Sequence, residues 1–162
     1  MHSLRHALAG LLLAIPAAVA WVSGAAFVFP SLGPTAFVLT GGDDPGPRRV
    51  VGGHVVGALA GLLAYRAVAA GLVVQTEAAA FAPAQGRIAL AGVLAVAATA
   101  VGMRATGTVH PPACATTLIV SLGLLATVPD VAVIVFGVCL LYAAFRAGTH
   151  VIDNRASPTV GA

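Results

Sequence analysis

Long apolar stretches, separated by short polar or proline-containing breaks, run through the whole sequence. Two short runs, at about residues 35–40 and 113–126, each follow a proline-containing break. The longer runs are predicted to be spanning helices, because a helix of roughly 20 residues crosses the hydrocarbon core of a bilayer. These longer runs cover about residues 4–22, 50–74, 87–103 and 131–145. The pattern predicts an all-α integral membrane protein with four full transmembrane helices and two short proline-broken segments.

The first apolar stretch has a second interpretation. A short basic start followed by an apolar run that ends at Ala18-Val19-Ala20 could be a cleaved signal peptide. The sequence stays apolar up to Phe29, however, and the rest of it is equally apolar. We therefore expect a first spanning helix.

The order of helix, short broken segment and helix occurs twice along the sequence. Gly33-Pro34-Thr35-Ala36 in the first half corresponds to Pro111-Pro112-Ala113-Cys114 in the second, although the letters match weakly. Three crossings per half would give the halves opposite orientations, as in many secondary transporters. The prediction is one transmembrane domain, 1–162, with an inverted 3+3 repeat of halves at about 4–74 and 87–147 and a polar tail at 148–162.

Composition supports a membrane protein and excludes other classes. Hydrophobic residues make up 59% of the sequence and charged residues only 8%, against roughly a quarter in soluble domains. The basic residues are eight scattered arginines and no lysine, which is not the dense basic surface of a nucleic-acid-binding protein. We therefore expect the lipid bilayer as a partner and no nucleic acid.

The arginine distribution predicts the orientation, because arginines near span ends favour the cytoplasmic side. If all six segments cross, one side of the membrane carries Arg5, Arg48, Arg49, Arg104, Arg146 and Arg155. If the segment after Pro34 only re-enters, Arg48 and Arg49 move to the other side, which fits the rule less well. We expect a multi-pass protein of the cell membrane with both termini cytoplasmic.

The tripeptide His110-Pro111-Pro112 is the first candidate for a functional site. Two prolines force His110 out of helical geometry just before a helix can start, and proline is favoured in the first helical turn. The N–H groups from Ala113 to 115 could then point at a bound anion, with Thr116 and Thr117 as further donors. The alternative is that the prolines end a loop and His110 bonds a backbone carbonyl.

A second helix start is predicted at Gly33-Pro34-Thr35, aimed at the same point from the opposite side. His54 begins the third apolar stretch, where it is either functional or merely interfacial. Arg66 lies deeper in that stretch and could hold substrate charge or anchor the helix at the interface. Arg104 lies near a span end, where a topological role is favoured.

Gly53, Gly57 and Gly61 recur at four-residue spacing, which lets membrane helices approach closely. This ridge could pack against a helix of the same chain or against a second copy, and we expect a homo-oligomer. No catalytic triad, paired carboxylate or HExxH zinc motif occurs, so we expect no enzymatic activity, metal or cofactor. The two cysteines lie in apolar segments and are predicted to be packing residues.

Three stretches, residues 31–36 (SLGPTA), 47–54 (PRRVVGGH) and 108–116 (TVHPPACAT), follow one another in order. Their order and spacing resemble those of the HPP family of integral membrane proteins, named for its His-Pro-Pro motif, over nearly the whole sequence. The resemblance implies four spanning helices. Some plastid and cyanobacterial relatives are associated with nitrite transport, so the resemblance makes nitrite a candidate substrate without establishing it.

Together, the residues and the resemblance predict a small transporter or permease for a small inorganic anion such as nitrite. If the anion moves with a proton, a histidine is suited to relay that proton. The alternative is a structural or regulatory membrane subunit without transport activity of its own. The predicted substrate-binding residues are Gly33, Pro34, Thr35, His54, Arg66, Arg104, His110, Pro111, Pro112, Thr116 and Thr117.

Overall fold

The computed structural model describes residues 2–41 and 44–156, and within these ranges every regular element is helical. The elements in order are α1 (His2–Ser23), α2 (Val28–Leu39), α3 (Pro47–Ala64), the π-helical turn η1 (Tyr65–Ala69), α4 (Pro83–Thr106), the 3-10 turn η2 (Pro111–Ala113), α5 (Cys114–Ser121) and α6 (Val128–Ala156). This confirms the predicted all-α class.

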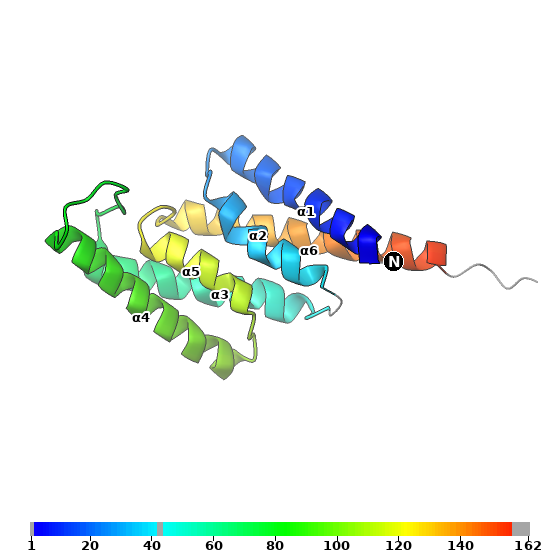
Figure 1. Cartoon of the computed structure of the whole chain (residues 1–162). Helices are drawn as coiled ribbons and strands as arrows, with labels where there is room; N and C mark the ends of the chain where they lie inside the picture. The colour runs from blue at the N-terminus through cyan, green and yellow to red at the C-terminus, as the bar shows by residue number, and fades with distance from the viewer. Residues whose placement is uncertain (1, 42–43, 157–162) are drawn as a thin grey trace, which may run out of the picture.

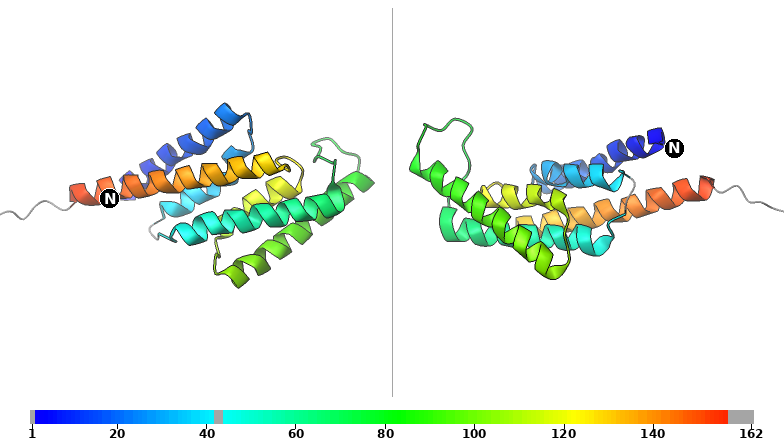
Figure 2. Two further views of the ribbon diagram at one scale, coloured as in Figure 1. Left: turned by 180° about the vertical axis from the view of Figure 1, so that it is seen from behind. Right: turned by 60° about the horizontal axis from the view of Figure 1, so that its bottom comes forward.

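The helices form an elongated bundle in which successive helices run in opposite directions (Figures 1 and 2). Helix α3 is central, since it contacts α4, α5 and α6. Helices α1 and α4 lie at opposite edges of the bundle in Figure 1, and α1 packs on α2 and α6. The start of α1 and the end of α6 lie at the same end of the bundle (Figure 1).

Three helical segments are long and apolar enough to cross a membrane: Pro47–Ala69, Pro83–Thr106 and Val128–Ile152. The described apolar part of α1, Gly10–Ser23, is shorter, so the fourth full span stays a prediction. Helix α2 has 12 residues and rises about 18 Å, against roughly 30 Å for the hydrocarbon core. Helix α5, with 8 residues, is shorter still, as expected for a broken segment.

The outward-facing side chains of the bundle are strongly apolar. Trp21 is 86% exposed, and Leu63, Phe37 and Val101 are also largely exposed on three other helices. Large apolar side chains on the outside are unfavourable in water but match the acyl chains of a bilayer. The surface therefore agrees with the segment lengths in indicating a membrane protein.

Helix α2 corrects the prediction that a helix begins at Pro34. The helix starts at Val28 and continues through Pro34, whose ring is exposed on the outer surface. Proline removes one backbone hydrogen bond, but membrane helices tolerate it where neighbouring groups satisfy the freed carbonyl. The segment is thus a short continuous helix, and Gly33-Pro34-Thr35 lies in its interior.

The last helix corrects two further boundaries. Val128-Pro129-Asp130, predicted as a turn, forms the first turn of α6, because the Asp130 carboxylate accepts hydrogen bonds from the Thr127 N–H (3.0 Å) and hydroxyl (2.6 Å). The helix then continues to Ala156, so most of the predicted polar tail is helical. Residues 157–162 of that tail lie outside the described residues.

Two other boundaries also shift. Helix α4 begins at Pro83, inside the loop predicted at 75–85, because proline suits a first helical turn. The run predicted at 113–126 is helical only to Ser121.

Candidate functional site

The backbone around the His-Pro-Pro motif brings His110 into the bundle. Gly107, with φ +67°, ends α4 in the left-handed conformation that glycine adopts without strain. The chain then turns back, and His110 is extended (φ −144°, ψ 90°) immediately before η2. The two prolines fit the start of this 3-10 turn, as the motif predicted, and His110 is 2% exposed.

The glycine ridge on α3 allows this segment to lie directly on the helix. A Cβ added at Gly53 would lie 2.8 Å from the His110 Cβ, and one at Gly57 would lie 2.7 Å from the Thr117 hydroxyl oxygen. A Cβ at Gly61 would lie 2.8 Å from the Thr117 carbonyl oxygen. Small residues permit such close approach between membrane helices. The ridge therefore packs within the same chain and positions η2 and α5.

Five buried side chains form a continuous series of hydrogen bonds, which we call the histidine–hydroxyl network. The Ser31 and Thr116 hydroxyls are 2.6 Å apart, and Thr116 Oγ1 lies 2.6 Å from His54 Nδ1. On the other side of the ring, His54 Nε2 lies 2.8 Å from Thr35 Oγ1. Thr35 Oγ1 also lies 3.3 Å from His110 Nε2, which is the longest link. The network thus joins α2, α3, α5 and the segment before η2.

The network is enclosed and neutral in composition. Four of its members are fully buried, and the imidazole rings of His54 and His110 lie 5.6 Å apart. Among the described side chains, every fully buried polar atom has a hydrogen-bond partner. Hydroxyls and imidazoles cost less to bury than fixed charges, provided that they are paired. The site can therefore hold and exchange protons inside an apolar bundle.

Neither predicted arginine joins the network. Arg66 lies in η1 with its side chain exposed, and Arg104 is exposed near the end of α4, where it lies 3.5 Å from the Ala100 carbonyl oxygen. Long cationic side chains near helix ends reach the interface and avoid the apolar interior. The prediction that these arginines share a site with His110 is wrong.

The backbone N–H groups of the motif are also used internally. The Ala113 N–H donates to the His110 carbonyl (3.0 Å), and the Cys114 N–H donates to the Pro111 and Pro112 carbonyls. These donors do not point freely into a break, and Pro34 marks no helix start. The prediction of two converging helix N-termini is therefore wrong. Instead, the buried face of α2 and the start of η2 lie against each other.

The remaining candidates lie around the network. Thr117 is fully buried, pairs with Thr99 at 3.0 Å and donates to the Ala113 carbonyl. Pro111 is exposed, and Pro112 and Gly33 are partly buried. Ser31 was missed from the sequence. Ser31 lies one helical turn before Thr35, so the spacing of these hydroxyls was the available signal.

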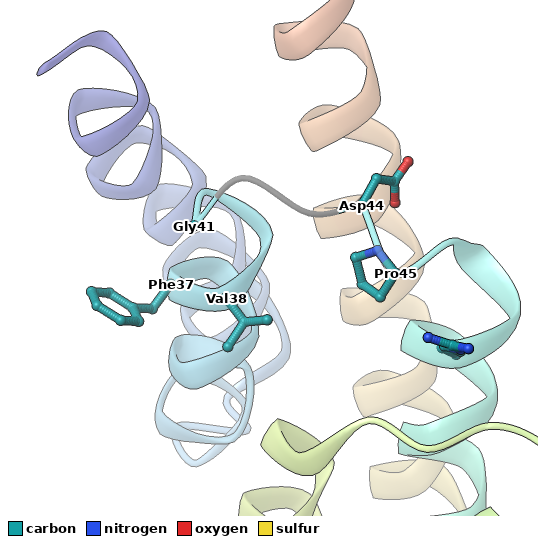
Figure 3. A pocket seen from close by; sticks show the side chains of 6 residues that line it. Phe37, Val38, Gly41, Asp44 and Pro45 are labelled. Atoms are coloured by element: carbon teal, nitrogen blue, oxygen red, sulfur yellow. The ribbon is translucent and has the colours of Figure 1, made fainter. Parts of the chain in front are cut away.

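A second polar cluster lies at the end of the bundle that holds the α2–α3 connection, and we call it the Asp44 cluster. The Asp44 carboxylate accepts hydrogen bonds from Tyr142 (3.0 Å) and Arg146 (2.5 Å), both on α6. Burial alone raises the pKa of Asp44, but bonds from the Gly46 N–H, Arg146 and Tyr142 outweigh it and lower the pKa below its ordinary 3.8. An open groove lies beside this cluster, and Figure 3 shows residues of α2 on one side and Asp44 with Pro45 on the other.

The described residues contain no group of three or more His, Cys, Asp or Glu side chains that could hold a metal ion. Cys114 and Cys139 are free thiols on different helices. The groups that the network does contain, imidazoles and hydroxyls, can form hydrogen bonds and exchange protons.

Comparisons with curated proteins and with solved structures gave no match. The model of the HPP transmembrane region matches residues 1–158. This match includes the His-Pro-Pro motif and every member of the histidine–hydroxyl network. The chain therefore belongs to the HPP family of transmembrane proteins.

Proposed function

We propose that this protein is a permease for a small inorganic anion, with nitrite as the first candidate, and that a proton moves with the anion. The observation that carries the proposal is the buried histidine–hydroxyl network in the middle of an apolar bundle. Ionisable side chains inside a membrane segment are costly and are typically functional. Structural packing alone does not require two histidines in contact with a single hydroxyl.

Charge balance supports the link to a proton. A bare anion next to the network would meet imidazoles and hydroxyls but no arginine, because Arg66 and Arg104 are exposed elsewhere. An unpaired charge in an apolar interior is strongly unfavourable. A proton held by His54 or His110, or carried on the anion itself, removes this cost and keeps the moving unit neutral.

The position of the network fits an inverted-repeat transporter. Ser31, Thr35 and His54 come from the first half of the chain, and His110 and Thr116 come from the second. In transporters built from inverted repeats the substrate site lies between the halves, near discontinuous helices. We therefore retain the inverted 3+3 repeat as part of the proposal, with α2 and α5 as the corresponding short segments.

The arginines support a multi-pass orientation in the plasma or inner membrane, with both termini in the cytoplasm. Arg48 and Arg49 open α3 and Arg104 lies near the end of α4, and Figure 1 draws these helix ends at the same end of the bundle as the termini. This placement follows the positive-inside rule. A homo-oligomer also stays in the proposal, although the glycine ridge no longer supports it, because residues 108–120 of the same chain cover that ridge.

The test is nitrite uptake by the purified protein in liposomes at two external pH values. We expect uptake to rise at the lower pH by more than it rises in protein-free liposomes. The protein-free liposomes give the baseline, because nitrous acid crosses lipid unaided. His110→Ala should lower uptake to the protein-free level, since it removes one end of the network. Gly86→Ala is the matched control, because an added Cβ there meets nothing within 4 Å.

Two outcomes would contradict the proposal. Unchanged uptake by a folded His110→Ala protein would remove the network from the transport path. No uptake of nitrite or other small anions by the wild-type protein alone would favour the structural or regulatory subunit role.

A further inference from the structure

The Thr35 hydroxyl lies between the two histidines and has a single proton. Its oxygen is 2.8 Å from His54 Nε2 and 3.3 Å from His110 Nε2. A hydroxyl donates one hydrogen bond and can accept two, and these two nitrogens are the only partners of the Thr35 hydroxyl among the described residues. The buried Thr35 proton is therefore paired only if Thr35 donates to one nitrogen and accepts from the other. One histidine therefore carries its proton on Nε2, and the other carries its proton on Nδ1.

The same constraint passes through His54 to the far end of the network. A neutral imidazole has one donor and one acceptor nitrogen, and both nitrogens of His54 are engaged. If Thr35 donates to His54 Nε2, then His54 Nδ1–H donates to Thr116, and Thr116 donates to Ser31. If Ser31 donates to Thr116, every bond reverses and Thr35 donates to His110.

We propose that the histidine–hydroxyl network is a two-state switch in which His54 and His110 always hold opposite tautomers, and that one proton passing from end to end exchanges them. In the first state His110 carries its proton on Nε2 and His54 on Nδ1. In the second state His54 carries its proton on Nε2 and His110 on Nδ1. This inference rests on the proposed function only for the identity of the substrate that accompanies the proton.

The conversion balances at every atom. A proton binds His110 Nδ1, the Nε2 proton of His110 moves to Thr35 Oγ1, and the Thr35 proton moves to His54 Nε2. The Nδ1 proton of His54 then moves to Thr116 Oγ1, and the Thr116 proton moves to the Ser31 hydroxyl. The proton that Ser31 held passes to a water molecule, which must enter beside Ser31 to accept it. Each group gains one proton and loses one, so no oxidant, reductant or metal is required.

The receiving end of the network has a ring nitrogen without a partner among the described residues. His110 Nδ1 has no hydrogen-bond partner among the described residues, although the side chain is 2% exposed. No unpaired side-chain nitrogen or oxygen in that part of the chain is fully buried, so Nδ1 retains a small accessible surface. An anion or its conjugate acid at this atom would deliver or remove the proton that sets the state.

The switch differs from a proton channel in what it does after one transfer. Both ring nitrogens of His54 are held by fixed partners, so a second transfer in the same direction needs every bond of the network to reverse first. A switch of this kind passes one proton for each reversal. We therefore expect one proton per transported anion and no proton leak when the anion is absent.

The test is the tautomer state of each histidine, measured by the ¹⁵N chemical shifts of ¹⁵N-histidine-labelled protein in liposomes. His54→Asn and His110→Asn variants assign the two signals. We expect opposite tautomers, either in one state or as an exchange between the two states. The same tautomer on both rings would overturn the switch, whatever the transport result.

A pair of substitutions at Thr35 gives the functional readout. Thr35→Val removes the hydroxyl without changing the size of the side chain, so we expect loss of the opposite-tautomer pattern and of proton-linked uptake. Thr35→Ser keeps the hydroxyl and should restore both, whereas Thr99→Val, a buried hydroxyl outside the network, should change neither. Full proton-linked uptake by Thr35→Val would overturn the switch.

The two measurements separate this inference from the proposed function. Opposite tautomers in a protein that moves no nitrite would keep the switch and reject nitrite as the substrate. Nitrite uptake by a protein whose histidines share one tautomer would keep the permease and reject the switch.

Discussion

The two polar clusters of this protein are built in opposite ways. The histidine–hydroxyl network is buried and contains only groups that are neutral when each holds its ordinary protons. The Asp44 cluster lies at an end of the bundle and contains a full ion pair, with Asp44 and Arg146 both substantially exposed. Both clusters tie helices together, but they use different chemistry to do so.

The difference follows from desolvation. An ion pair near water retains part of its hydration, so it is tolerated but contributes little. The same pair in the bundle interior would lose that hydration, whereas a paired hydroxyl or imidazole loses much less. Buried neutral groups also have a property that ion pairs lack, because their donors and acceptors can exchange roles. The interior cluster is therefore suited to moving protons, and the end cluster is suited to fixing a connection.

Among the substitutions that distinguish the two clusters, Gly57→Leu is expected to have the largest effect on the free energy of unfolding. An added Cβ alone would meet the Thr117 hydroxyl and the Ala113 carbonyl at 2.7 and 3.0 Å, so a larger side chain must push α5 away from α3. Overpacking of this kind costs about 3 kcal/mol or more of the free energy of unfolding. Unfolding of the protein in mixed micelles measures this loss.

The matched control is Gly86→Leu, because Gly86 is exposed and a Cβ added there would meet no atom within 4 Å. It should leave the free energy of unfolding within about 0.5 kcal/mol of the wild-type value. Equal losses in the two variants would show that the ridge does not position α5.

A smaller but more specific effect is expected for His54→Leu. The substitution leaves the Thr35 hydroxyl with only the long 3.3 Å contact to His110 and leaves Thr116 with Ser31 alone. Weakening buried hydrogen bonds in this way costs about 1–3 kcal/mol. Thermal unfolding in detergent measures the stability, and liposome uptake should fall to the protein-free level. Wild-type uptake by the folded variant would contradict a role of the network in transport.

The sequence predicted most members of the network, but it predicted neither Ser31 nor the hydrogen bonds that join the members. His54, Thr35, His110 and Thr116 were identified because they flank helix breaks or begin an apolar segment, and the structure brings them into contact. The pairing of Ser31 with Thr116 spans 85 positions of the sequence. Such a contact depends on the rotation of two helices about their axes, which the apolar pattern of uniformly hydrophobic helices does not fix.

The errors at Pro34 and at the arginines have a common physical cause. Proline is a strong helix breaker in water, but a membrane helix continues through Pro34 because leaving the helix would expose more unpaired backbone to lipid. Arg66 and Arg104 lie in apolar segments by numbering, yet long side chains let their charges lie outside the core. Sequence position alone gives the depth of a residue in the membrane only approximately. The direction of its side chain decides whether it joins a buried site.

The smallest effect is expected for Asp44→Asn, which tests the other side of the comparison. The lowered pKa means that Asp44 is ionised at neutral pH, so its bond to Arg146 is fully present above the ordinary value of 3.8 and is lost as the pH falls through the lowered value. The wild-type protein should therefore be slightly more stable than Asp44→Asn at neutral pH, and this difference should vanish in acid and shrink in high salt.

Uptake at neutral pH should be unchanged, because the histidine–hydroxyl network contains none of the residues of the Asp44 cluster. Thermal unfolding at neutral and acidic pH measures the first effect and liposome uptake the second. A loss of uptake in Asp44→Asn as large as that in His54→Leu would mean that the end of the bundle gates the same path, and the division between a fixing cluster and a proton-moving network would then fail.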